Sequence, residues 1–216
     1  MKSAKYLRVV PVLGLFAFSA AHAETVDQQV KALPAAVQKT LTAESPQGGV
    51  VKIEPKTMEG AMRYKIGIQS QGQKRTLVIE STGNLLVAKT EVSTDALPAP
   101  VGKTLDGQTQ GAQVESRSLV SKAGKTYYEV ELQVSGHKKE LLIEQSGELT
   151  RIEEVVPIES VPPIVKSAIE KRASQGKLLK VKTIIFKGKL VAYEAAVDVK
   201  GLKSEFKLTP EAQPFN

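Results

Sequence analysis

A short phrase with a proline near its start occurs three times in this chain at a constant spacing. The copies stand at residues 33–37, 97–101 and 161–165, and each starts 64 residues after the one before it. A constant period of this length is typical of one small structural unit repeated in tandem. After a short lead at residues 24–32, we therefore expect three modules, at residues 33–96, 97–160 and 161–216.

Each copy begins with a helical pattern and continues with strand patterns. Leu33, Val37 and Leu41 stand four residues apart, the spacing that places side chains on one face of an α-helix. Further along each copy, apolar residues fall at every second position between glycine-containing turns, which predicts antiparallel strands. The sequence therefore predicts an α+β fold of three tandem modules. In each module one helix packs on a three- or four-stranded antiparallel sheet, and the third module lacks the last strand.

The alternation also predicts which strand residues are buried and which are available for contacts. Tyr64, Tyr128 and Tyr193 head equivalent strands, and we expect their rings to anchor the core. The opposite sheet face is expected to meet water, either as a solvated surface or as a binding surface. Tyrosine is enriched at protein interfaces, so an outward-pointing tyrosine is a further candidate. The candidate contact residues on these outer faces are Arg63, Lys65, Tyr127, Glu129 and Glu131.

The first 23 residues have the features of a secretory signal peptide. Lys2, Lys5 and Arg8 precede an apolar run from Val9 to Ala20, and small residues at the end of the segment predict cleavage after Ala23. No later segment is apolar enough to be a transmembrane helix. We expect the mature chain in the periplasm or outside the cell. It contains no cysteine, so it cannot be stabilised by disulfide bonds.

Little in the sequence points to catalysis. The expected mature chain contains a single histidine, His137, in a predicted hairpin turn and without recognisable partners. No serine lies in a nucleophile-elbow pattern, and two glutamates on one strand supply too few oxygens for a calcium ion. We therefore predict that the protein is not an enzyme, has no metal site and uses no cofactor.

The third module is the most basic part of the chain. It contains 11 lysines and arginines against 5 acidic residues, and Lys180 and Lys182 on its first predicted strand are added to the candidate binding residues. Such a surface attracts anionic lipid head groups, envelope polymers or an acidic protein. Nucleic acid is excluded as a partner, because an exported chain does not meet it and no aromatic residues alternate with the lysines.

The order of these signals resembles the PepSY-like family, also described as β-lactamase-inhibitor-like. The strand signature of that family is present at residues 64–68 and 128–132, and its turn at 80–83 and 144–147. The resemblance, taken as three tandem copies, implies exported proteins that combine a helix with an antiparallel sheet. For relatives it implies inhibition or protein binding, and it transfers no active-site residue.

Two functional hypotheses follow from the sequence. The first is an exported, non-enzymatic binding protein that recognises or inhibits another envelope protein through its outer sheet faces. The alternative is an envelope-surface protein that binds anionic lipid or polymer through its basic third module. An enzyme of unfamiliar design is a third possibility, and it would need polar groups that converge in a deep pocket.

Overall fold

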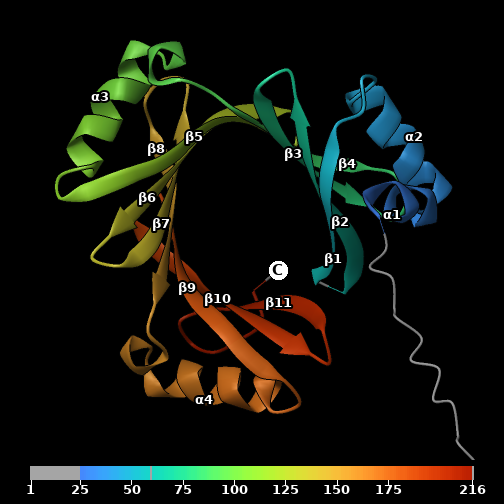
Figure 1. Ribbon diagram of the computed structural model, residues 1–216. Coiled ribbons are helices and arrows are strands. Elements are labelled where there is room, and N and C mark those ends of the chain that lie inside the picture. Colours follow the sequence, from blue (N-terminus) through green and yellow to red (C-terminus); the bar gives the residue numbers. More distant parts are fainter. Residues whose placement is uncertain (1–24, 59, 216) are drawn as a thin grey trace, which may run out of the picture.

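The computed structural model describes residues 25–58 and 60–215, so the expected signal peptide at 1–23 lies outside the described residues. Eleven strands pair into one closed barrel, and the helices lie on its outside (Figure 1). The strands are β1 (Val50–Met58), β2 (Ala61–Ser70), β3 (Gln73–Glu80), β4 (Leu85–Glu91), β5 (Ala112–Lys122), β6 (Lys125–Val134), β7 (His137–Glu144), β8 (Leu149–Val156), β9 (Lys177–Phe186), β10 (Lys189–Val199) and β11 (Leu202–Leu208).

The α-helices of the described residues include three that begin 64 residues apart. These are α2 (Ala35–Glu44), α3 (Ala99–Gln108) and α4 (Pro163–Ala173), each preceded by a proline as N-cap residue. The expected lead contains a further helix, α1 (Val26–Ala32), whose N-cap Thr25 forms a capping box with Gln28. Single 3-10 turns, η1 (Thr94–Ala96) and η2 (Ile158–Ser160), precede α3 and α4. Among the described helices none has the length and apolar character needed to cross a membrane.

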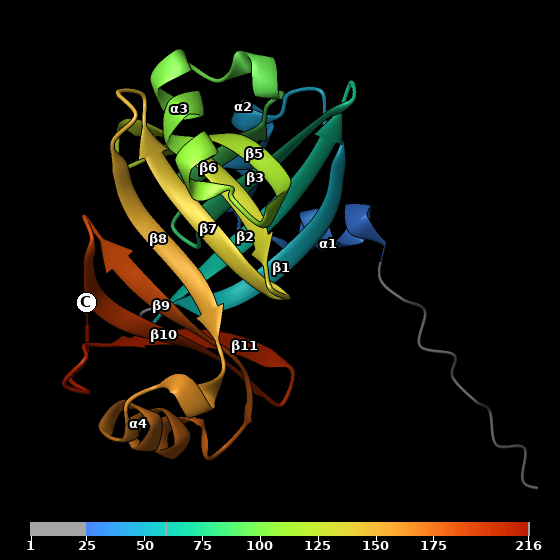
Figure 2. The same cartoon turned by 90° about the vertical axis from the view of Figure 1, so that its left-hand side faces the viewer.

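Each of the three later helices covers a separate apolar cluster on the outer surface of the barrel, so the core is divided into three parts (Figures 1 and 2). Tyr193 is buried in the cluster under α4, and Tyr64 and Tyr128 pack at the edges of the other two. Fully buried side chains of the three clusters include Val37, Ile66, Leu77, Val101, Leu132, Leu141, Val165 and Ile169.

Two turn glycines hold helices against the barrel. The hydroxyl of Thr40 in α2 donates a hydrogen bond to the carbonyl oxygen of Gly83, in the turn between β3 and β4, at 2.6 Å. Gly83 has a φ of +92°, and a Cβ at this position would lie only 2.9 Å from the carbonyl oxygen of Ala36. The same contact recurs between Thr104 and Gly147 at 2.7 Å. Glycine is therefore needed at these turns for close approach to the helix as well as for the positive φ.

The barrel closes where its first and last strands meet. Strands that follow one another in the sequence run antiparallel, and their number is odd, so β1 and β11 must run in the same direction. Their pairing is parallel and joins only Thr57 with Ser204 and Met58 with Glu205. We call this two-residue ladder the seam.

The predicted fold class is wrong, although the order of its elements agrees with the structure. The expected groups of four, four and three strands are present. The expectation of three separate helix-on-sheet modules fails because the groups share one sheet. β4 pairs with β5 over five residues, β8 pairs with β9 over six, and the seam closes the circle. Consequently the sheet face that was expected to meet water lines the inside of a barrel.

Two isoleucines of α4 test this arrangement. Ile169 is 0% exposed beneath the helix, whereas Ile164 is 60% exposed on its surface. Truncation of a buried isoleucine leaves a cavity, so Ile169→Ala should lower the free energy of unfolding by about 2–5 kcal/mol. The matched control Ile164→Ala should change it by less than about 0.5 kcal/mol. Chemical denaturation measures both, and equal losses would contradict the packing of α4 described above.

Candidate functional site

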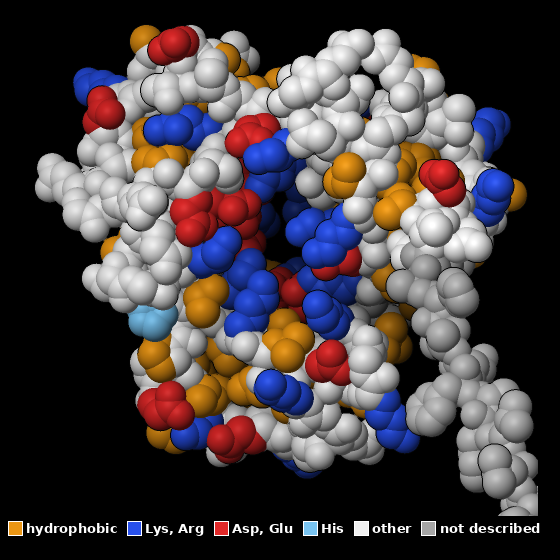
Figure 3. Space-filling model, in the orientation of Figure 1, with side chains coloured by type: hydrophobic (Ala, Val, Ile, Leu, Met, Phe, Trp, Pro, Cys, Tyr) orange, Lys and Arg blue, Asp and Glu red, His pale blue; other side chains and the backbone are white. Residues whose placement is uncertain are grey.

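The barrel encloses a charged cavity, which we call the lumen. Residues directly opposite in antiparallel strands share a face of the sheet. Glu131, Glu140 and Glu153 are joined in this way across β6, β7 and β8, and all three face the lumen. The cavity has a volume of about 510 Å³, and all eleven strands contribute to its lining. Figure 3 shows side chains of both charges gathered around its opening.

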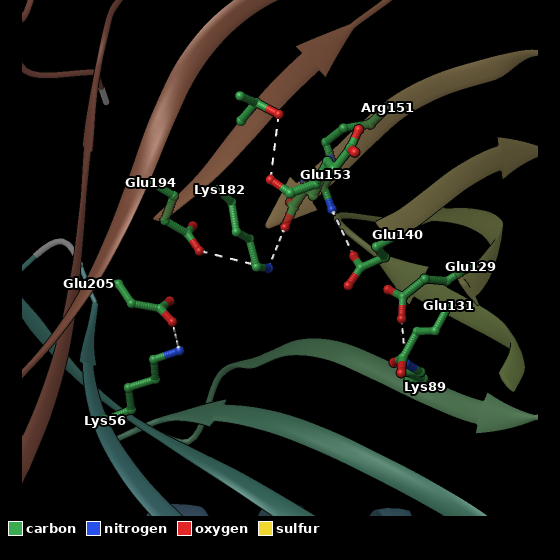
Figure 4. Close-up of polar contacts among 12 residues, drawn as sticks. Lys56, Lys89, Glu129, Glu131, Glu140, Arg151, Glu153, Lys182, Glu194 and Glu205 are labelled. Atoms are coloured by element: carbon green, nitrogen blue, oxygen red, sulfur yellow. Dashed lines mark hydrogen bonds and ion pairs between the residues drawn. The ribbon is translucent and has the colours of Figure 1, made fainter. Parts of the chain in front are cut away.

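Positive charge is in excess in this lining. Eleven lysines and arginines face six glutamates, an excess of five positive charges when all groups are ionised. The six glutamates are Glu129, Glu131, Glu140, Glu153, Glu194 and Glu205. Each of them forms an ion pair with a cation that also lines the lumen (Figure 4).

The longest series of ion pairs follows the wall from β7 to β10. Arg151 contacts Glu140 at 3.9 Å and Glu153 at 3.3 Å, and Lys182 contacts Glu153 at 2.7 Å and Glu194 at 3.9 Å (Figure 4). Glu153 and Glu194 are only 9% and 7% exposed. Burial by itself lowers the pKa of Lys182, but the surrounding carboxylates, Glu153 first, outweigh it and leave that pKa raised. Two cations thus pair with three carboxylates in this part of the wall, and burial together with the charge of Glu205 still raises the pKa of Glu194.

A second group of ion pairs joins β4 to β6. The Lys89 ammonium bonds to Glu129 and, at 2.6 Å, to Glu131. Carboxylate oxygens of Glu129, Glu131 and Glu140 all lie within 4.8 Å of one another, which is compact enough for a cation. The Lys89 ammonium bonds to two of the three carboxylates and Arg151 contacts the third at 3.9 Å, so protein cations already occupy the positions around the cluster.

Three lysines of the lining differ from these paired groups. Lys65, Lys122 and Lys180 are exposed to solvent and form no ion pair with any residue that the structure describes. Although Lys122 reaches solvent, its partial burial lowers its pKa, and the positive charges of Arg151 and Lys207 lower it further. Partial burial and then the positive charge of Lys182 lower the pKa of Lys180 in the same way. The lumen therefore presents unpaired cations to its contents. A bound anion would stabilise the charged form of these lysines.

The structure brings six of the seven candidate residues from the sequence into this one site. Arg63, Lys65, Glu129, Glu131, Lys180 and Lys182 all line the lumen. The expected position of Arg63, Lys65, Glu129 and Glu131 on outward, water-facing sheets is wrong, because the closed barrel turns that face inward. Tyr127 is not part of the lining and is half-buried, opposite Val120 on β5 and Glu144 on β7. The binding roles of these residues remain predictions.

Other residues of the lumen were missed at the sequence level. They include Lys89, Lys122, Glu140, Arg151 and Glu153. A weak signal was present on β8, where the lumen-facing Arg151 and Glu153 stand on either side of the apolar Ile152. Alternation assigns residues to one face of a strand, but it does not indicate which strands meet across a barrel.

Comparison with known protein families identifies one that matches most of the chain. A family described as "Putative beta-lactamase-inhibitor-like, PepSY-like" matches residues 20–87 and 126–211. The resemblance seen in the sequence is thus confirmed for the family, whereas the match in two segments leaves three tandem copies as a prediction. No curated protein matches the chain.

Several solved structures from Bacteroides species are similar to part of the chain. A DUF2874 family protein from Bacteroides uniformis is 18% identical, with 56% of this chain and 88% of that chain covered and a TM-score of 0.46. A protein from Bacteroides eggerthii named among "putative periplasmic proteins" is 16% identical, with the same coverage and a TM-score of 0.48. A BLIP-like protein from Bacteroides fragilis is 20% identical, with 56% and 86% covered and a TM-score of 0.44.

The ionisation of Glu140 should be visible in the stability of the protein. Burial, assisted by the charges of Glu129 and Glu153, raises the pKa of Glu140 from 4.5 to about 7. The folded state therefore holds this proton more tightly than the unfolded state, and stability is lost as the pH rises from 4.5 through 7. Glu140→Gln should raise the free energy of unfolding by about 1–3 kcal/mol near pH 8 and change it little near pH 4.

Denaturation curves at the two pH values measure this difference. Glu170→Gln on α4 is the matched control, because Glu170 lies outside the barrel and is exposed. Its effect should be small and the same at both pH values. A Glu140→Gln variant that is less stable than the parent near pH 8 would contradict the assignment.

Proposed function

We propose, because this chain belongs to the PepSY-like family, that it is a non-enzymatic binding protein of the cell envelope which takes an acidic segment of another protein into its lumen. Polar groups do converge in the lumen, as an enzyme would require, but each of its glutamates is ion-paired with a lysine or arginine of the wall. The inhibitor-like description of the family supports binding to a protein rather than catalysis. The signal-peptide features of residues 1–23 support export to the periplasm or beyond.

The distribution of charge in the lumen carries the proposal. The glutamates lie in the wall and are paired, while Lys65, Lys122 and Lys180 are exposed and unpaired. An entering ligand therefore meets cations first. A carboxylate is the acidic group that proteins carry without modification, and a flexible segment can follow the curvature of the lumen.

The geometry gives less support to the alternative of an anionic lipid surface. Lys180 and Lys182 line a concave cavity, and Lys182 is already bound to Glu153 at 2.7 Å. A flat membrane cannot reach lysines distributed around the inside of a ring. Attraction to lipid would have to depend on exposed lysines outside the lumen, such as Lys171 in α4 and Lys187 in the turn between β9 and β10.

Calorimetry with a capped hexaglutamate peptide tests the proposal on the mature chain. The peptide should bind, and capped hexalysine should not. The double variant Lys122→Gln/Lys180→Gln should weaken binding by about tenfold or more, because two uncompensated lumen cations are lost. Affinity should also fall when the salt concentration is raised from about 0.05 M to about 0.3 M.

The matched control is Lys103→Gln/Lys171→Gln, which removes the same charge from exposed positions on α3 and α4. It should bind hexaglutamate as the parent does. Equal losses in the two double variants would mean that only net charge matters, and the lumen would then not be the site. Binding to anionic vesicles that the lumen variant leaves intact would favour the lipid alternative.

A further inference from the structure

The first strand of the barrel extends beyond its partner at the seam. β1 pairs with β2 from Val50 to Met58, but with β11 only at Thr57 and Met58. If the parallel register is continued backwards, the first residue of β11, Leu202, comes opposite Pro55. Residues 50–54 therefore have no strand beside them on that edge, and among the described residues nothing else bonds to their backbone there. We call this segment the free edge.

The opposite side of the seam is covered by the chain itself. Beyond Glu205, the C-terminal residues return along β11, where Pro214 bridges to Leu208 and the Phe215 N–H donates to the Lys207 carbonyl oxygen at 3.1 Å. The edge of β11 is thus protected against further pairing. Pro55 has no N–H to donate, which limits pairing on β1 to residues 50–54.

The residues of the free edge favour strand pairing, and Val51 and Lys52 among them are exposed. Val50 and Ile53 are half-buried and, like Val30 of α1, pack against the apolar cluster under α2. Val50, Val51 and Ile53 are β-branched, and β-branched residues are enriched in strands. Val51 is 58% exposed. An accessible edge with unpaired N–H and C=O groups is a template for another strand. Adding a strand to such an edge is a recurring mode of peptide recognition.

The charges around the free edge favour an acidic strand. A hydrogen bond from Lys52, followed by the charges of Lys65 and Lys203, lowers the pKa of Glu54 despite its partial burial. Glu54 thus lies among three lysines that belong to β1, β2 and β11. Lys56 and Lys65 continue from the free edge into the lumen. An extended segment beside β1 would place its side chains among these cations.

We infer that the free edge is a strand-addition site, where an extended acidic segment of a partner protein pairs with residues 50–54 and directs carboxylates towards the unpaired Lys65. Backbone hydrogen bonds hold the segment in register, and the lysines select acidic side chains. The inference rests on the proposed function, because it assumes that the ligand of the lumen is an acidic protein segment.

The test compares peptides that differ only in their backbone donors. A capped six-residue peptide of alternating glutamate and valine should bind the mature chain. The same peptide with N-methyl groups on every second residue keeps its charges but loses the N–H groups of one edge. Of the two possible methylation patterns, one should bind about tenfold more weakly or worse, since several backbone hydrogen bonds are lost.

A crosslinking experiment locates the peptide on the chain. The natural sequence has no cysteine, so Val51→Cys introduces a single thiol at the free edge. A peptide whose one cysteine is activated as a thiopyridyl mixed disulfide should exchange with this variant and release thiopyridone, and should not do so with Lys103→Cys on α3. Light scattering without peptide should show a monomer. A dimer whose formation blocks the crosslink would assign the free edge to a second copy of this chain and overturn the inference.

The two proposals fail in different ways. If neither hexaglutamate nor the alternating peptide binds, the proposed function is wrong. If both bind, but neither methylation pattern weakens binding and no disulfide forms at Val51→Cys, the lumen takes acidic segments by charge alone. In that case only strand addition is wrong.

Discussion

The two faces of the sheet require different surroundings, one apolar and one aqueous, and this constraint determines the rest of the structure. Most strands carry apolar residues on one side and charged residues on the other, although β3 presents Thr76 and Val78 to the interior. The helices α2, α3 and α4 bury the apolar side from outside the barrel. The inside of many small barrels is filled by side chains. Here the apolar positions are already used, so closure leaves a water-accessible interior lined with lysine, arginine and glutamate.

Closure brings these charges together from strands that are distant in the sequence. Lys56 on β1 meets Glu205 on β11, and Lys89 on β4 meets Glu129 and Glu131 on β6. A buried charge stabilises the barrel only when it has a partner of opposite charge, because moving an unpaired charge out of water costs free energy. Glu153 and Glu194 are buried and paired accordingly, whereas the unpaired lysines keep their contact with solvent.

The sequence contains enough information for the elements but not for their assembly. Spacings of four and of two residues locate the helices, the strands and the anchoring tyrosines, because these patterns report contacts within one element and its immediate cover. The pairing of Val87 with Lys122, which joins the first group of strands to the second, depends on residues 35 positions apart that share no local pattern. For the same reason Arg63 and Lys65 could be recognised as polar-face residues, but not as facing Glu129 and Lys180 across one cavity.

The seam follows from the odd number of strands and relates the fold to recognition. With an even number, the first and last strands would run antiparallel and could pair along their full length. With eleven, β1 and β11 run parallel, and only two residue pairs form before β11 begins opposite Pro55. The barrel therefore keeps an accessible edge of residues 50–54 beside its cationic interior. A strand antiparallel to β1 could pair along its whole length, so the parallel closure of eleven strands is what leaves residues 50–54 unpaired on this side of the lumen.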